Sequence, residues 1–191
     1  MKRILALAPL TIAATPALAH LNPEQHGSFA AGLSHPLFGL DHILVMVAVG
    51  LWAAVLGGRA CWALPASFMA AMTVGFVAAL SGFTLPLVEP MILASVFALG
   101  FLVALSMRLP TSAAMGVVAA FALFHGVAHG SELGAATALT FGAGFVLSTA
   151  LLHAAGVVVA LASARSLVNS QIIRGLGCAT VFGGVWAAVA G

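Results

Sequence analysis

Long apolar runs, separated by short polar breaks, constrain this chain more than any other feature of its sequence. A helix that crosses a bilayer needs about 20 predominantly apolar residues. Six runs of about that length lie near residues 37–56, 61–83, 91–107, 111–129, 135–163 and 173–190. We therefore predict an all-α polytopic membrane protein with six transmembrane helices. Because three spans precede the central break and three follow it, a 3+3 inverted repeat is also expected.

The composition excludes the soluble classes of protein. The chain has 191 residues, of which 63% are hydrophobic and only six are basic and four acidic. Soluble domains carry about 25% charged residues. A soluble globular protein, a disordered chain and a nucleic-acid-binding basic face are all excluded. The expected partner of most of the surface is the lipid bilayer, and the sequence carries no signal of oligomeric state.

The N-terminus has the pattern of a secretory signal peptide. Residues 1–19 begin with Lys2 and Arg3, continue as a short apolar stretch and end in Ala17-Leu18-Ala19, an A-x-A cleavage site. We predict a signal peptide over residues 1–19 and a membrane domain over residues 20–191. An uncleaved anchor is the alternative. Both interpretations leave residue 20 outside the cytoplasm.

The charged residues then fall on opposite sides of the membrane. With residue 20 outside, the first, third and fifth breaks face the cytoplasm. These breaks hold all the basic residues of the mature chain, which are Arg59, Arg108, Arg165 and Arg174. The outer segments hold Glu24, Glu89 and Glu132 and no Lys or Arg. This distribution follows the positive-inside rule and predicts a bacterial inner-membrane protein with a periplasmic N-terminus.

The first polar motif is His35-Pro36-Leu37-Phe38-Gly39-Leu40-Asp41-His42, at the outer end of the first span. If the helix begins near Pro36, a favoured first-turn residue, His35 and His42 are seven residues apart on one face. A carboxylate inside the bilayer costs several kcal/mol unless it is paired, hydrated or bound to a cation. The position of Asp41 therefore predicts that its carboxylate is paired, hydrated or bound to a cation.

The second motif is His125-Gly126-Val127-Ala128-His129-Gly130-Ser131-Glu132, at the outer end of the fourth span. His125 and His129 have the i,i+4 spacing at which two side chains on one helix meet. Glu132 extends the same face if the helix continues. Both motifs thus occupy the same outer third of the membrane on two different helices.

Imidazoles mixed with carboxylates suit borderline divalent metals such as nickel, cobalt, zinc and copper. No Lys or Arg lies within the membrane or in the outer segments to balance Asp41 instead, because Arg174 lies at the cytoplasmic edge of the last run. We hypothesise a metal site formed by His35, Asp41, His42, His125, His129 and Glu132. A purely structural hydrogen-bond network is the alternative.

Three further histidines are candidate accessory ligands. His153, near the middle of the fifth span, is either such a ligand or an interhelical hydrogen-bonding residue. His20 and His26 lie in the mature N-terminal segment. They form either a metal-loading site or part of a merely solvated tail.

The two motifs resemble the signatures of the HupE/UreJ family, whose second motif begins with Phe124 here. The resemblance covers the signal peptide, the six spans and both motifs. It implies a small bacterial permease for nickel, sometimes cobalt, that serves hydrogenase or urease maturation. It also implies functional roles for the six residues of the hypothesised site. The first motif is similar to the His-x4-Asp-His of wider nickel/cobalt transporters, but five residues separate His35 from Asp41 here.

We therefore expect a secondary transporter rather than an enzyme, with Ni2+ or Co2+ as transported substrate and no tightly bound cofactor. The chain has no P-loop sequence for ATP hydrolysis. One alternative is an intramembrane metal-dependent hydrolase, although Gly126 stands where a zincin would carry its general base. Another is a haem-binding membrane electron carrier, which would leave Asp41 and Glu132 without a role.

Overall fold

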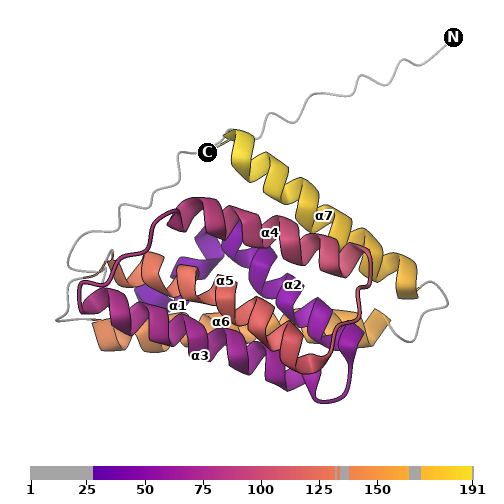
Figure 1. Ribbon diagram of the computed structural model, residues 1–191, viewed down its shortest axis with the longest axis horizontal. Helices are drawn as coiled ribbons and strands as arrows, with labels where there is room; N and C mark the ends of the chain where they lie inside the picture. The colour runs from indigo at the N-terminus through magenta and orange to yellow at the C-terminus, as the bar shows by residue number, and fades with distance from the viewer. Residues whose placement is uncertain (1–27, 132, 134–137, 164–168, 191) are drawn as a thin grey trace, which may run out of the picture.

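The computed structural model describes residues 28–131, 133, 138–163 and 169–190, which form a bundle of helices (Figure 1). The helices are α1 (Phe29–Phe38), α2 (Leu40–Leu56), α3 (Ala60–Leu80), α4 (Val88–Ala104), α5 (Thr111–Ser131), α6 (Ala138–Ser163) and α7 (Asn169–Ala190). Among the described residues these seven helices are accompanied by no strand. The predicted signal peptide lies outside the described residues.

The helix lengths fit a polytopic membrane protein. Four helices, α3, α5, α6 and α7, are long and apolar enough to cross a membrane. The pair α1 and α2 forms a fifth candidate span that is bent by 87°. Helix α4 is apolar but has only 17 residues, or about 26 Å by helical rise. The all-helical membrane fold is supported, while the count of six spans stays a prediction.

The first helix is the largest departure from the predicted elements. The sequence predicted one span beginning near Pro36, whereas Pro36 lies inside the separate helix α1. This helix begins earlier because the Ser28 hydroxyl accepts a hydrogen bond from the backbone N–H of Ala31, at 3.0 Å. A serine that caps a helix in this way satisfies a backbone donor that would otherwise have no partner.

Two other boundaries also differ. Arg174 was predicted in the last cytoplasmic break but lies in the second turn of α7, where its Nε donates to the carbonyl of Ala104 at 3.1 Å. That bond satisfies a free carbonyl at the C-terminus of α4. Glu89 was predicted in a loop but lies in the first turn of α4, where an acid interacts favourably with the helix dipole. Residues 134–137, where the fifth span was predicted to begin, lie outside the described residues.

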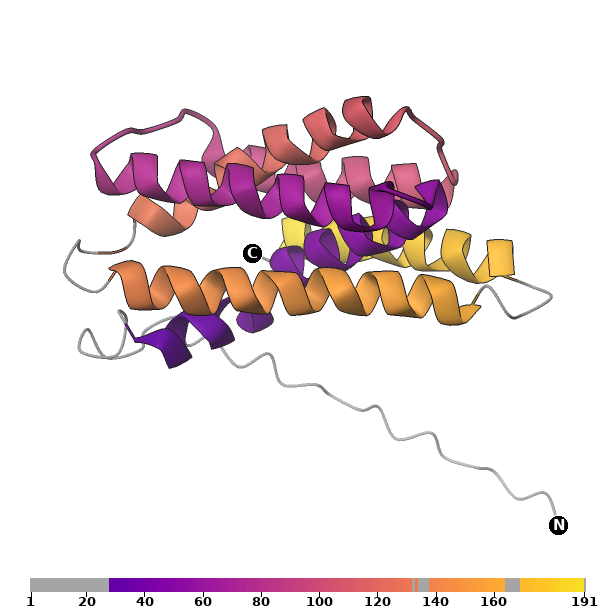
Figure 2. The ribbon, with the colours of Figure 1, turned by 90° about the horizontal axis from the view of Figure 1, so that it is seen from below.

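Glycines bring the helix backbones into direct contact. A Cβ on Gly75 of α3 would overlap the carbonyl oxygen of Leu123 on α5, and one on Gly126 of α5 would overlap that of Met72 on α3. Gly32 makes the same kind of contact between α1 and α6, and Figure 2 shows α1 lying against α6. Such close approach is how helices associate in lipid, where van der Waals packing replaces the hydrophobic effect.

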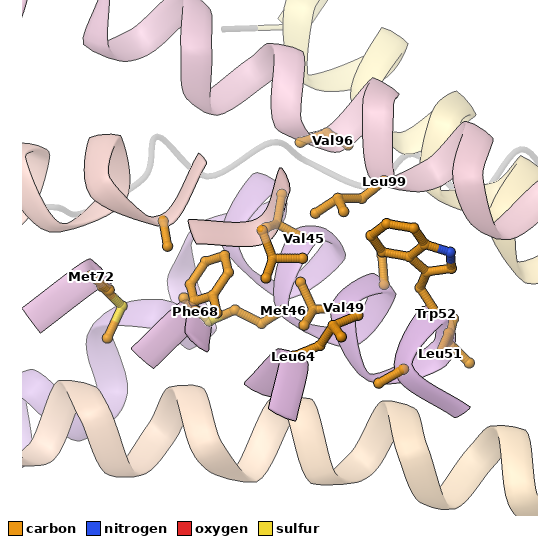
Figure 3. Close-up of a cluster of buried hydrophobic side chains, with 14 of the residues drawn as sticks. Val45, Met46, Val49, Leu51, Trp52, Leu64, Phe68, Met72, Val96 and Leu99 are labelled. Atoms are coloured by element: carbon orange, nitrogen blue, oxygen red, sulfur yellow. The ribbon is translucent and has the colours of Figure 1, made fainter. Parts of the chain in front are cut away.

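The outside of the bundle is apolar and its core is tightly filled. Side chains such as Leu139, Phe182 and Val189 are among the large apolar groups that point outward, as lipid-facing helices require. Inside, α2, α3 and α4 contribute a cluster of fully buried side chains that includes Trp52 and Phe68 (Figure 3).

The connections between helices lie at opposite ends of the bundle. Figure 1 shows the α2–α3 and α4–α5 connections at one end and the α3–α4 connection at the other. Arg59 and Arg108 belong to the first two connections, and Arg174 contacts the end of α4 close by. Among the described residues, the basic side chains therefore gather at one end of the bundle.

The glycine contacts predict a sharp difference between two alanine substitutions. Gly75→Ala pushes a methyl group against the α5 backbone and should lower stability by about 1–3 kcal/mol. Gly116→Ala, on α5, meets no atom within 4 Å and should be neutral or stabilising, by up to about 1 kcal/mol. Thermal unfolding of both purified variants in detergent measures the difference. Equal melting temperatures would contradict the packing.

Candidate functional site

A break in the chain sets up the site. Between α1 and α2, Gly39 adopts an extended conformation with φ −93° and ψ 114°, and the two helices meet at 87°. The prediction that His35 and His42 lie on one face of a single helix is therefore wrong. A Cβ on residue 39 would lie 2.7 Å from Nδ1 of His42 and 2.9 Å from Oδ1 of Asp41. Glycine is needed here because the Asp41–His42 pair packs against the backbone.

Asp41 and His42 form a tight pair in the first turn of α2. Oδ1 of Asp41 accepts a hydrogen bond from Nδ1 of His42 at 2.8 Å and another from the backbone N–H of His42, also at 2.8 Å. An ionised carboxylate can only accept, so Nδ1 of His42 carries the proton. In the neutral imidazole, the lone pair is then on Nε2. The partner predicted for Asp41 is therefore the adjacent histidine.

The second motif lies on α5 with both imidazoles turned into the bundle. His125 is fully buried and His129 is 3% exposed. Nδ1 of His125 donates to the carbonyl of Phe121 at 3.0 Å. A carbonyl oxygen also only accepts, so the lone pair of His125 is on Nε2. This atom is buried and has no hydrogen-bond partner among the described residues.

The two motifs contact each other inside the bundle. Nε2 of His42 lies 2.6 Å from Nε2 of His129. The ring centroid of His35 lies 4.6 Å from that of His129, and the ring centroid of His125 lies 5.3 Å from that of His42. Four imidazoles from α1, α2 and α5 thus form one group, which we call the outer histidine cluster: His35, His42, His125 and His129.

The cluster has nitrogen donors for a divalent ion, but two of these nitrogens lie too close together to bind one ion as they stand. A metal ion bound 2.0–2.1 Å from two imidazole nitrogens at a right angle sets them about 2.9 Å apart. The His42 and His129 nitrogens are closer than that. Among the described residues, no three His, Cys, Asp or Glu side chains are arranged to hold an ion in this conformation. Entry of an ion therefore requires the imidazoles to move apart by a few tenths of an ångström or more.

Phenylalanine side chains from the neighbouring helices pack against the rings of the cluster. Phe145 packs edge-on against His129, with ring centroids 4.5 Å apart, and Phe141 packs against His35. Phe68 of α3 packs against His125 at 5.6 Å. No spacing pattern distinguishes these phenylalanines from ordinary core residues, so the sequence could not single them out.

The remaining candidate residues lie elsewhere. Glu132, His20 and His26 lie outside the described residues. His153 is buried on α6 and donates from Nδ1 to the carbonyl of Met46 at 2.7 Å, as expected of an interhelical hydrogen-bonding residue. It does not belong to the outer histidine cluster.

Two comparisons with known proteins both find similarity to HupE / UreJ proteins. The family model described as "HupE / UreJ protein" matches residues 8–187. The curated protein named "Protein HupE" from Rhizobium leguminosarum bv. viciae is 44% identical over 166 residues, which cover 86% of each chain. No solved structure gives a significant match.

The contact between the two motifs predicts an energetic coupling. In metal-free detergent, His42→Ala and His129→Ala should be non-additive in their effect on unfolding free energy, with a coupling of about 0.5–3 kcal/mol. The control pairs His42→Ala with Gly116→Ala, which should add to within about 0.5 kcal/mol. Additive behaviour of the histidine pair would mean that the two motifs do not meet.

Proposed function

Because the chain belongs to the HupE/UreJ family, we propose that it is a secondary permease that takes up Ni2+ across the bacterial inner membrane. The family is a transporter family rather than a family of enzymes, and it is associated with nickel and cobalt transport for hydrogenase or urease. An enzymatic role such as the intramembrane hydrolase is therefore set aside. The finer assignment, with nickel as substrate, follows the association of the family with nickel and cobalt, and the outer histidine cluster supplies donors that suit such ions.

The observation that carries the proposal is the approach of Nε2 of His42 to Nε2 of His129 at 2.6 Å. The two nitrogens come from motifs 87 residues apart in the chain. Imidazole is a preferred ligand for nickel, and the order of affinities places cobalt just below it. In this proposal Ni2+, or Co2+, is the transported substrate.

Each residue of the proposed site has a separate role. The imidazoles of the outer histidine cluster are the ligands. Asp41 holds His42 in the tautomer that presents Nε2, and its charge compensates part of the charge of the ion. Glu132 follows α5 in sequence and is a further carboxylate ligand in this proposal. His20 and His26 raise the local metal concentration at the periplasmic N-terminus after cleavage of residues 1–19.

The proposal predicts that Asp41→Asn and His129→Ala each lower the rate of 63Ni uptake per membrane-inserted molecule by at least about tenfold. Loss of a group that orients a ligand histidine typically costs 10–100-fold in metal affinity. Asp41→Asn keeps the shape and an acceptor oxygen, so the protein should still accumulate.

Ser131→Ala is the matched control. Ser131 lies in the same turn as His129, but its hydroxyl donates to the carbonyl of Ala128 within α5 at 2.7 Å. Its uptake should match that of the unchanged protein. A structural network would produce the reverse result, in which the Asp41 and His129 variants accumulate poorly but transport normally per molecule.

The proposed orientation predicts the outcome of reporter fusions. Fusions after Arg59 and Arg108 should report the cytoplasm, and a fusion after Glu89 should report the periplasm, because arginine marks the cytoplasmic side. An alkaline phosphatase fusion, active only in the periplasm, makes the measurement. A periplasmic signal after Arg108 would invert the second half of the protein and separate the two motifs.

A further inference from the structure

His153 has the features of a metal-binding histidine although it lies outside the outer histidine cluster. It is 1% exposed and lies near the middle of α6. Because its Nδ1 donates to the carbonyl of Met46, its lone pair is on Nε2. Nε2 is fully buried and has no hydrogen-bond partner among the described residues. A buried polar atom without a partner is costly, and a polar residue within a membrane helix indicates a functional site.

The same construction recurs in the outer histidine cluster. In His42 the acceptor for Nδ1 is a carboxylate, in His125 it is the carbonyl of Phe121, and in His153 it is the carbonyl of Met46. Metal-binding histidines usually donate their second nitrogen to a carboxylate or a backbone carbonyl, which fixes the tautomer and the ring orientation. His153 shares this feature with two candidate ligands.

One aromatic ring lies between His153 and the outer histidine cluster. The Phe68 ring packs edge-on against His125, with centroids 5.6 Å apart, and against His153, with centroids 5.0 Å apart. His153 is therefore the next imidazole beyond the cluster, one phenyl ring further into the bundle. In the proposed orientation α6 runs from the periplasmic side toward the cytoplasm, so the position of His153 fits an ion that moves inward.

The surroundings of His153 favour weak binding. Thr149, one turn earlier on α6, donates from its hydroxyl to the thioether sulfur of Met72 at 3.8 Å. Met46 and Met72 belong to the same buried cluster as Phe68 (Figure 3). Among the described residues, His153 takes part in no salt bridge. A single imidazole suits a borderline transition metal but lacks the carboxylate partner that His42 has in the outer site.

We propose that Nε2 of His153 is a second, transient ligand for the divalent transition-metal ion, which reaches it from the outer histidine cluster when the Phe68 ring turns aside. This inference rests on the proposed transport function. A channel or carrier needs successive sites that bind strongly enough to admit the ion but weakly enough to release it. In this proposal Nε2 of His153 is the site that binds the ion more weakly and so allows its release.

The test uses His153→Asn, whose side-chain amide can still donate to the carbonyl of Met46 but which lacks Nε2. The rate of 63Ni uptake per membrane-inserted molecule should fall by about tenfold. Equilibrium binding of Ni2+ to the purified protein should stay within about twofold, because the outer site is intact. Thr149→Val, which removes a neighbouring hydroxyl but leaves the imidazole, is the control and should transport normally.

The outcomes separate this inference from the proposed function. If the unchanged protein takes up Ni2+, and His153→Asn takes it up at the same rate per molecule, His153 is structural and the inference is overturned. If the unchanged protein neither binds nor takes up Ni2+, the proposed function itself fails.

A measurement on the unchanged protein covers the case in which the variant does not accumulate. Cu2+ and ascorbate oxidise histidines that bind the copper ion, and mass spectrometry locates the modified residues. His153 should be oxidised together with the outer histidine cluster, and excess Ni2+ should protect both. Oxidation confined to the outer cluster would overturn the inference.

Discussion

The charge of Asp41, which is only partly buried, is the constraint on which the rest of the site depends. A carboxylate within an apolar bundle must be paired, and here the adjacent His42 pairs with it at 2.8 Å. That bond fixes the His42 tautomer and directs Nε2 toward His129 of α5. The Asp41–His42 pair also requires glycine at residue 39, because a Cβ there would contact both side chains. The chain breaks at this residue, so His35 lies on α1 while Asp41 and His42 lie on α2.

Close backbone contacts make this geometry possible. Gly75 and Gly126 let α3 and α5 approach until side chains would overlap backbone atoms, and this brings Phe68 against His125. Gly50 and Gly156 do the same for α2 and α6, close to the bond from His153 to Met46. These glycines therefore help to set the positions of the imidazoles.

Much of this arrangement follows from the sequence, and the reasons for the exceptions are physical. Apolar run length predicted the helices, and i,i+4 spacing predicted that His125 and His129 share a face of α5. The break at Gly39 could not be predicted, because Pro36 is favoured in the first turn of a helix and so indicated the start of a helix rather than a position inside an earlier one. Only tertiary packing, through the backbone carbonyl of Met46, reveals that His153 presents Nε2.

The most direct test of the account is the coordination of nickel in the purified protein, measured by X-ray absorption at the nickel edge. A site made by the outer histidine cluster predicts nitrogen and oxygen ligands, with the multiple-scattering pattern of at least two imidazoles. The number of imidazoles should fall when His42 is replaced by alanine. Coordination by water and carboxylate alone, or an unchanged spectrum in His42→Ala, would contradict the proposal that the two motifs bind one ion.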